Sequence, residues 1–405
     1  MNNDIKIEKE GKKEKLIGIA IIATVVLLTI LIIVIVNVNK KKEQDKALTN
    51  IYVATGGGKE DFIADKDVIK IMEDKYKLNV VYDNWSNGKT VTAPLIREYV
   101  HQGNNNIPES SWSVNCTECS KYNVLFTSDE RFYDYYKLSP NKNNGEADRY
   151  YVKDGRLTLN TPIVIYSWKD VAEALIKEKI VSKEGDIYYI TDTTKLLDYI
   201  LEGKKWSDIG LDIYGKINIY STDPVTSSPG ATYYGLLLSI MTDGDMSEQK
   251  ITAALPKLKE FYLASGYMNN TPADLFEKYL REGQGSKPMI VDYEKSIMEL
   301  ATANPDAYKA VSEKLVILYP KPTIWNSHCI ATFDDEGNKY LKAFDDKDIQ
   351  QIAWSKYGFR VGVSGGSYDV SAVSVKGIPQ EITSVTSGLK MDTYNKIIDY
   401  LKESN

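Results

Sequence analysis

Cysteine and histidine are scarce in this 405-residue chain, which holds three cysteines and two histidines. Three cysteines are too few for a disulfide scaffold, and the odd number leaves one thiol unpaired. With only His101 and His328, neither a Ser-His-Asp triad nor a zinc site stands out, and no short nucleophile motif of the hydrolases occurs. We therefore expect a protein that is not an enzyme and that holds no metal or cofactor.

Internal repeats and low-complexity tracts are also absent. A glycine-rich loop, Gly56-Gly57-Gly58-Lys59, resembles a phosphate loop only superficially, because Glu60 stands where that motif requires Ser or Thr. The net charge is −6, and the first 49 residues hold an excess of lysine, so the rest of the chain is more acidic still. Nucleotide hydrolysis and nucleic acid partners are therefore not expected.

One long apolar run is present, beginning at Leu16 and ending at Val36. It is long enough to cross a bilayer as a helix of about 20 residues. A cleaved signal peptide would have a shorter apolar core that ends at small residues, whereas Asn37 and Lys40 follow here. We expect a cytoplasmic tail over residues 1–15, a transmembrane helix over residues 16–36 and a hydrophilic linker over residues 37–49. Residues 37–405 would then be extracellular on a single-pass protein of the cell membrane.

After the linker, strand and helix patterns alternate. Residues 51–54 and 78–82 are predicted to be strands, and residues 65–76 between them form an amphipathic pattern of helical period. Later strands are expected at residues 122–126, 161–166, 288–293 and 315–319. Helices are expected between them, one of them over residues 272–282. A strand-helix-strand order favours an α/β fold with a mainly parallel sheet covered by helices. With 43% hydrophobic residues, the chain can bury a large core and hold two lobes.

The stretch from Ser221 to Tyr234 is predicted to be a strand-loop-helix junction, because an alternating run precedes it and an apolar segment of helical length follows. Ser228 is a preferred N-cap residue, and Pro229 suits the first helical position. Gly230 would let another molecule approach the backbone, where this N–H and the next two are unpaired. Such a helix start suits an anionic or polyhydroxy ligand. The alternative is a capped helix that binds nothing.

Cys116 and Cys119 are separated by two residues in a stretch rich in polar residues. Outside the cell we expect a local disulfide, while half of a metal site and a redox pair remain alternatives. Trp85 and Trp112 lie in the same polar region and are candidates for contact with another molecule.

Several phrases in order along the chain resemble bacterial extracellular solute-binding proteins. The closest similarity is to the type II periplasmic-binding fold, in the branch that includes molybdate and sulfate binders. The phrases are residues 161–165, the stretch from Ser221, Val291-Asp292-Tyr293-Glu294, residues 319–323, and residues 349–354 with 357–360.

The resemblance implies two α/β lobes joined by a two-strand hinge. Lobe 1 would comprise residues 50–162 and 319–405, and lobe 2 residues 163–318. In such proteins the ligand lies at loops and helix N-termini that face the cleft. The resemblance therefore implies these ligand-binding residues: Thr55, Gly56, Ser128, Ser221, Thr222, Ser227, Ser228, Gly230 and Tyr293.

The function that follows is capture of a small ligand, an oxyanion or another small polar solute, between the two lobes. The partners would be that small molecule and a membrane permease of the ABC type or a sensor. The alternative is a surface interaction or assembly protein that has this fold and no transport role.

Overall fold

The computed structural model describes residues 28–34, 36, 48–84, 122–131, 133–134, 152–361, 369, 373 and 375–403. Residues 28–34 and 36 are helical, and the rest of the apolar run from Leu16 to Val36 lies outside the described residues. Within the described part of the chain, no helix has both the length and the apolar character that a bilayer crossing requires. The transmembrane segment stays a prediction.

The first strands form the parallel unit that the sequence predicts. Strand β1 (Thr49–Thr55) pairs in parallel with β2 (Leu78–Asn84) and with β3 (Val124–Phe126). Helix α3 (Lys66–Tyr76) connects β1 to β2. Its N-cap, Asp65, accepts hydrogen bonds from the backbone N–H groups of residues 67 and 68, as a short acidic cap residue does.

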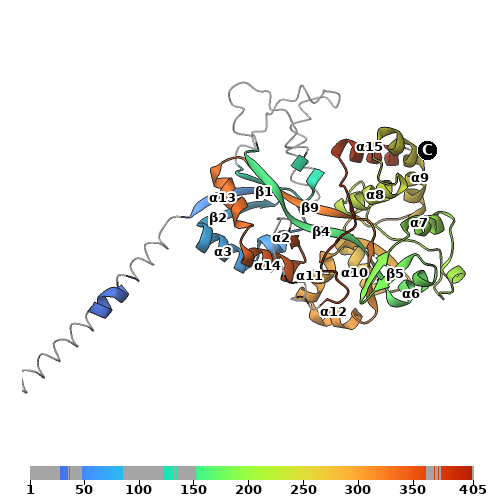
Figure 1. Ribbon diagram of the computed structural model, residues 1–405, viewed down its shortest axis with the longest axis horizontal. Coiled ribbons are helices and arrows are strands. Elements are labelled where there is room, and N and C mark those ends of the chain that lie inside the picture. Colours follow the sequence, from blue (N-terminus) through green and yellow to red (C-terminus); the bar gives the residue numbers. More distant parts are fainter. Residues whose placement is uncertain are drawn as a thin grey trace, which may run out of the picture.

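The complete sheet is mixed, so the expectation of a mainly parallel sheet is wrong. The long strand β4 (Asp154–Trp168) runs antiparallel to β9 (Thr323–Thr332), β8 (Leu315–Pro320) and β7 (Met289–Tyr293). The strand order is β2-β1-β3-β9-β4-β8-β6-β5, with β7 and β10 also paired to β4. Figure 1 shows β4 and β9 crossing the molecule side by side, from the α3 and α13 end toward the helices around α8 and α10. The antiparallel pairing has a geometric reason. If the chain passes from one lobe to the other along β4 and returns along β9, these two strands must run in opposite directions.

The remaining strands are short and most of the helices cover the sheet. They are β5 (Val181–Glu184), β6 (Ile187–Ile190), β10 (Arg360–Val361), β11 (Val385–Thr386), α2 (Glu60–Ile63), α6 (Lys169–Lys177), α7 (Thr193–Leu201), η4 (Trp206–Ile209), α8 (Ser228–Met241), α9 (Glu248–Ala264), α10 (Pro272–Glu282), α11 (Lys295–Ala303), α12 (Pro305–Val311), α13 (Asp335–Ala343), α14 (Lys347–Tyr357) and α15 (Met391–Lys402).

The apolar residues form separate cores at the two ends of the sheet. The larger core surrounds the second half of β4, where Ile163, Val164, Ile165 and Tyr166 are all buried because helices cover both faces. Around β1 and β3 the side chains alternate between two smaller clusters, with Val124 and Phe126 in one and Leu125 in the other. Two distinct cores on one continuous sheet are the arrangement that a two-lobed chain requires.

The carboxyl-terminal helix belongs with the larger core. Helix α15 packs against α9, and its residues Ile397 and Leu401 are buried in that core. In Figure 1, α15 lies beside α8 and α9, at the opposite end of the sheet from α3 and α13. The sequence places residues 319–405 together in lobe 1, whereas the structure returns the last helix to the other end. The exact boundaries of the lobes stay a prediction.

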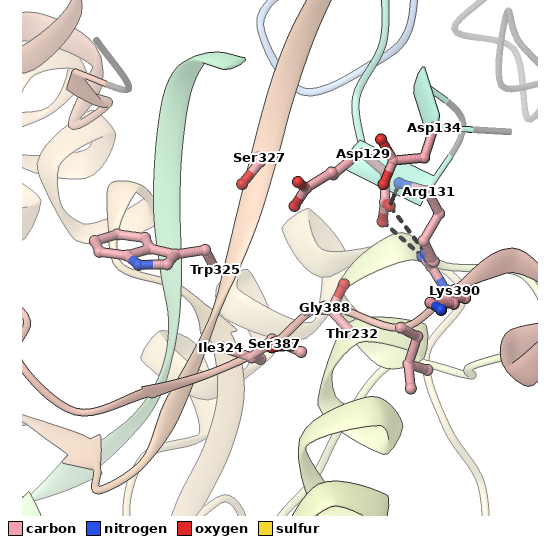
Figure 2. Close-up of a pocket in the computed structure, with 12 residues that line it drawn as sticks. Asp129, Arg131, Asp134, Thr232, Ile324, Trp325, Ser327, Ser387, Gly388 and Lys390 are labelled. Atoms are coloured by element: carbon pink, nitrogen blue, oxygen red, sulfur yellow. Dashed lines mark hydrogen bonds and ion pairs between the residues drawn. The ribbon is translucent and has the colours of Figure 1, made fainter. Parts of the chain in front are cut away.

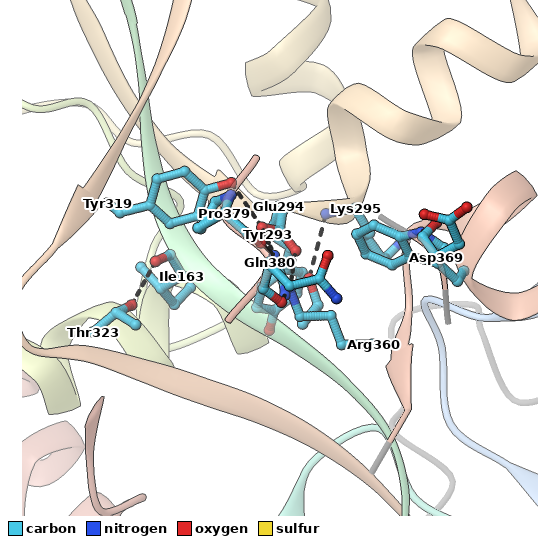
Figure 3. Close-up of polar contacts among 12 residues, drawn as sticks. Ile163, Tyr293, Glu294, Lys295, Tyr319, Thr323, Arg360, Asp369, Pro379 and Gln380 are labelled. Carbon is cyan, nitrogen blue, oxygen red and sulfur yellow. Dashed lines mark hydrogen bonds and ion pairs between the residues drawn. The ribbon is translucent and has the colours of Figure 1, made fainter. Parts of the chain in front are cut away.

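A buried ion pair holds the junction between the two halves (Figure 3). The Arg360 guanidinium on β10 donates to both oxygens of Glu294, with Nε–Oε2 2.6 Å and Nη2–Oε1 2.8 Å. Tyr319 at the end of β8 donates its hydroxyl to Oε1 over 2.7 Å. Arg360 also donates to the carbonyl oxygens of Pro379 and Gln380. One ion pair therefore connects β8, β10, the start of α11 and the carboxyl-terminal segment.

The exchange of Glu294 for Gln should lower the free energy of unfolding by about 3–5 kcal/mol, because it leaves the buried Arg360 charge unbalanced. Replacing both residues by Met should cost less than the sum of the two single replacements, since no charge is left behind. Urea unfolding of the variants measures these differences.

The control is Glu336→Gln, which removes an exposed pair with Lys339 and should cost less than about 1 kcal/mol. Equal losses for Glu294→Gln and Glu336→Gln would show that the buried pair does not carry the junction.

Candidate functional site

The loop before α8 uses most of its hydroxyl groups internally. Ser221 donates to the Thr222 carbonyl oxygen over 2.6 Å, and Ser227 donates to the Thr222 hydroxyl over 2.8 Å. The N-cap of α8 is Ser227 and not Ser228, which is the first helical residue. The predicted strand before this loop is reduced to isolated bridges, one of which pairs Tyr220 with Ile290.

Gly230 serves the packing of this loop against its helix. A Cβ atom at this position would lie 2.3 Å from the Thr222 carbonyl oxygen and 2.9 Å from Pro224 N. The space that we assigned to an approaching molecule is therefore filled by the chain itself. The Ala231 N–H bonds to the Ser227 carbonyl oxygen, so it is not one of the unpaired donors that the sequence predicts. Contact of these residues with a solute stays a prediction.

The predicted residues of lobe 1 lie together at the ends of β1 and β3. The Gly56 N–H bonds to the Phe126 carbonyl oxygen, and a Cβ atom on Gly56 would lie 2.9 Å from both Ser128 N and Ser128 Oγ. Thr55 is buried and donates its hydroxyl to the Gly56 carbonyl oxygen. The glycine is needed here because two loops meet at backbone distance.

A cavity of about 240 Å³ lies next to both groups of residues (Figure 2). Four segments line it. They are residues 129–131 and 134 after β3, Thr232 in the first turns of α8, Ile324, Trp325 and Ser327 on β9, and residues 387–390 before α15. None of the nine predicted ligand-binding residues is among the residues that line it, but Ser128 and Gly230 are one and two positions away in the chain. The predicted loops border this cavity, and the binding role of the nine residues stays a prediction.

An ion pair between two residues of the same short segment, Asp129 and Arg131, lies at this cavity. The Arg131 guanidinium donates to both Asp129 oxygens, with Nε–Oδ1 2.8 Å and Nη2–Oδ2 2.6 Å, and both side chains are buried. The Tyr394 ring of α15 lies 4.3 Å from the guanidinium carbon. Nη1 of Arg131 is buried and has no hydrogen-bond partner in the described structure.

Tyr293, another predicted residue, lies near this group. It ends β7, the residue is 7% exposed, and its hydroxyl is buried beside Thr232. Burial raises its pKa well above the ordinary value, and the nearby Asp129 carboxylate adds to that effect. Tyr293 therefore contributes a neutral hydroxyl from the second half of the molecule.

Two further carboxylates make the opening of the cavity acidic. Glu130 and Asp134 both line it. Burial raises the pKa of Glu130, and the negative charges of Asp134 and Asp129 raise it further. A carboxyl group whose pKa is raised by neighbouring carboxylates favours a nearby positive charge.

Lys59 is a buried lysine, although it follows three glycines in the loop after β1. It is 2% exposed, and its ammonium group lies 2.8 Å from the Gly56 carbonyl oxygen and 3.3 Å from the Thr127 carbonyl oxygen. His328 Nδ1 lies 3.4 Å away. Burial lowers the pKa of Lys59 to about 7 and that of His328 well below its ordinary value. Lys59 thus connects the two loops beside the cavity at the cost of a buried charge.

The other residues that the sequence suggests for a disulfide, a metal site or contact with another molecule lie partly within and partly outside the described residues. Cys329 is a free, buried thiol on β9. Cys116, Cys119, His101, Trp85 and Trp112 lie outside the described residues, and so does any disulfide between the first two. Within the described ranges, no three His, Cys, Asp or Glu side chains are grouped so that they could hold a metal ion.

Asp292 precedes Tyr293 on β7 and is 2% exposed. Its carboxylate accepts a hydrogen bond from the Tyr293 N–H over 2.7 Å. Burial is the largest influence and raises the pKa of Asp292 to about 6. The protein therefore keeps a carboxylate ionised at neutral pH in a position that disfavours ionisation.

The replacement Asp292→Asn should stabilise the protein at neutral pH. Because the pKa is raised on folding, the contribution of Asp292 is fully favourable below about pH 4 and is lost as the pH rises through 6. The variant has no carboxylate to ionise and does not lose this stability. Its free energy of unfolding should therefore exceed that of the original protein by an amount that grows from pH 5 to pH 8 toward about 3 kcal/mol. Urea unfolding across that range measures the difference. The exposed control Asp212→Asn should show no such trend, and a variant that is less stable than the original at pH 8 would contradict the prediction.

No protein-family model matches this sequence, and no curated protein does. Solved structures do share its fold. An extracellular solute-binding protein from Bordetella parapertussis aligns with a TM-score of 0.54 and 11% identity, over 87% of this chain and 96% of that one. The ferric binding protein from Campylobacter jejuni aligns with a TM-score of 0.53 and 14% identity, over 87% and 99%.

A Trichodesmium protein in complex with iron and citrate aligns with a TM-score of 0.51 and 13% identity, over 87% of this chain and 98% of that one. Identities this low establish the fold alone. The chain therefore has the two-lobed α/β fold of extracellular solute-binding proteins, as the resemblance implied. The molybdate and sulfate branch stays a prediction.

Proposed function

We propose that this protein is a membrane-anchored, extracellular solute-binding protein that captures a small polar solute between its two lobes. The observation that supports this most directly is the cavity of about 240 Å³, to which both halves contribute side chains. Asp129 and Ser327 come from the end of the sheet near β1, and Thr232 comes from α8 at the other end. A solute that touches both sets favours the closed arrangement over the open one.

The proposed action is binding without chemistry. The groups beside the cavity are an ion pair, hydroxyls and exposed carboxylates, which serve recognition. Release to an ABC-type permease or to a sensor would follow capture. The membrane anchor in this proposal rests on the apolar run from Leu16 to Val36, and the extracellular location of residues 37–405 follows from it.

The alternative is an interaction or assembly protein that has kept the fold. In such a protein we expect side chains to fill the space between the lobes. The cavity that both halves line favours solute binding over that alternative. The iron named for similar structures is a property of those proteins, and our proposal does not depend on it.

A thermal-shift screen of the full-length protein in detergent tests the proposal. The library should contain oxyanions, sugars, amino acids and short peptides. A true ligand at 100 times its Kd should stabilise the folded state by about 2.7 kcal/mol by mass action. Ser387 lines the cavity and is exposed, so Ser387→Trp should fill the site and abolish the shift without lowering the melting temperature of the free protein.

The matched control is Ser207→Trp, at an exposed serine that does not line the cavity, and it should keep the shift. A ligand that stabilises Ser387→Trp as strongly as the original would place binding elsewhere. If nothing in the library stabilises the protein, the interaction protein becomes the better interpretation.

A further inference from the structure

Lys59 is enclosed by neutral groups near the cavity. Its Nζ atom lies 2.8 Å from the Gly56 carbonyl oxygen, 3.3 Å from the Thr127 carbonyl oxygen and 3.4 Å from His328 Nδ1. The centre of the Phe126 ring is 4.6 Å away. Lys59 is 2% exposed, and no carboxylate bonds to it within the described part of the chain. Its nitrogen therefore depends on these three polar partners.

His328 extends this contact to the wall of the cavity. On the other side of the imidazole ring, Nε2 lies 3.2 Å from Asn326 Nδ2, which donates to the Ser128 carbonyl oxygen over 3.0 Å. Both His328 and Asn326 are 2% exposed. Asp129 follows Ser128, and Ser327 lies between Asn326 and His328, and both of these neighbours line the cavity. A chain of hydrogen bonds thus runs from Lys59 to two segments of the cavity wall.

A neutral amine on Lys59 fits this chain of hydrogen bonds. The amine has two hydrogens for the two carbonyl oxygens, and its lone pair accepts the proton of His328 Nδ1. His328 Nε2 is then free of a proton and accepts one hydrogen of the Asn326 amide. The second amide hydrogen holds the Ser128 carbonyl oxygen.

A proton on Lys59 reverses the direction of the bonds. An ammonium group has three hydrogens and no lone pair, so His328 Nδ1 has to accept and the imidazole proton moves to Nε2. That proton requires the oxygen of the Asn326 amide, and Oδ1 is buried without a partner among the described residues. When the amide turns to present Oδ1, its NH2 group leaves Ser128. The Ser128 carbonyl oxygen then loses the donor that holds it.

We propose that Lys59 positions the cavity wall after β3 through His328 and Asn326, and that it releases this wall when the amine takes up a proton. Lys59 acts here as a positioning residue, since it does not line the cavity. The proposal concerns the wall itself, so it holds whatever the cavity binds and does not rest on the proposed function.

The release should occur near neutral pH. Burial is the largest influence and lowers the pKa of Lys59 to about 7, while Glu60 and Cys329 raise it and Lys295 lowers it. Burial and the charges of Lys59 and Lys295 lower the pKa of His328 well below its ordinary value. The imidazole therefore stays neutral and changes only its tautomer. The anchored wall should predominate above pH 7 and the released wall below it.

The tautomer of His328 can be measured by ¹⁵N NMR of the full-length protein in detergent, because protonated and unprotonated ring nitrogens differ in chemical shift. The background is His101→Gln, which leaves His328 as the only histidine. We expect the proton on Nδ1 at pH 8.5 and on Nε2 at pH 6. The same tautomer at both pH values would overturn the proposal, and this comparison requires no substitution at Lys59, His328 or Asn326.

Hydrogen exchange with mass spectrometry measures the release of the wall. After correction for the intrinsic effect of pH, the amides of residues 127–131 should exchange about fivefold faster at pH 6 than at pH 8.5, as expected for the loss of one hydrogen bond. Equal corrected rates would overturn the release.

Two variants identify the source and the end of the effect. Lys59→Met has a side chain of similar length without a titrating group, so neither the tautomer nor the exchange should change with pH. The matched control Lys66→Met, at an exposed lysine on α3, should keep both changes. Asn326→Leu lacks the donor to Ser128, so residues 127–131 should already exchange fast at pH 8.5.

The outcomes for the variants are equally decisive. A tautomer that still changes with pH in Lys59→Met would overturn the role of Lys59. Slow exchange of residues 127–131 in Asn326→Leu at pH 8.5 would overturn the anchor at Ser128. Neither result depends on a solute, so the solute-binding function is tested separately by the thermal-shift screen.

Discussion

The buried ion pair between Glu294 and Arg360 determines how the two halves of this protein are joined. Glu294 follows β7, and its N–H bonds to the Pro162 carbonyl oxygen, at the point where β4 changes from one set of neighbours to the other. Nearby, Thr323 donates its hydroxyl to the Ile163 carbonyl oxygen over 2.6 Å (Figure 3). The charge pair therefore lies where β4 and β9 both pass. Several segments of the chain form hydrogen bonds with its two side chains. Such a pair specifies an arrangement more than it adds stability, because desolvation offsets much of the attraction.

This constraint also places the cavity. The residue next to Glu294 is Tyr293, which lies near Asp129 and Arg131. Arg360 holds residues 379 and 380 by their carbonyl oxygens. The chain continues from there to residues 387–390, which form one wall of the cavity. Short stretches of chain therefore connect the ion pair to one wall of the cavity.

Much of the architecture follows from local patterns. The apolar run at residues 163–166 predicts a buried strand, and Thr271 with Pro272 marks the start of α10 as the structure has it. The parallel pairing of β1 with β2 was predicted from alternation and one amphipathic helix, and the structure adds β3 to that unit. The antiparallel pairing of β4 with β9 was not, because these strands are more than 150 residues apart and no local pattern encodes which strands meet. The return of α15 to α9 was missed for the same reason.

The site shows the same division between what is local and what is not. By itself, the sequence determined that polar loops follow β3 and precede α8, because strands end and helices begin at recognisable residues. The tertiary structure alone decided which side chains of those loops meet. Ser221 and Ser227 satisfy Thr222, whereas Asp129 and Arg131, next to the predicted Ser128, line the cavity. Hydroxyl groups can bond to their own backbone or to a ligand, and only the position of the opposite wall determines which of the two occurs.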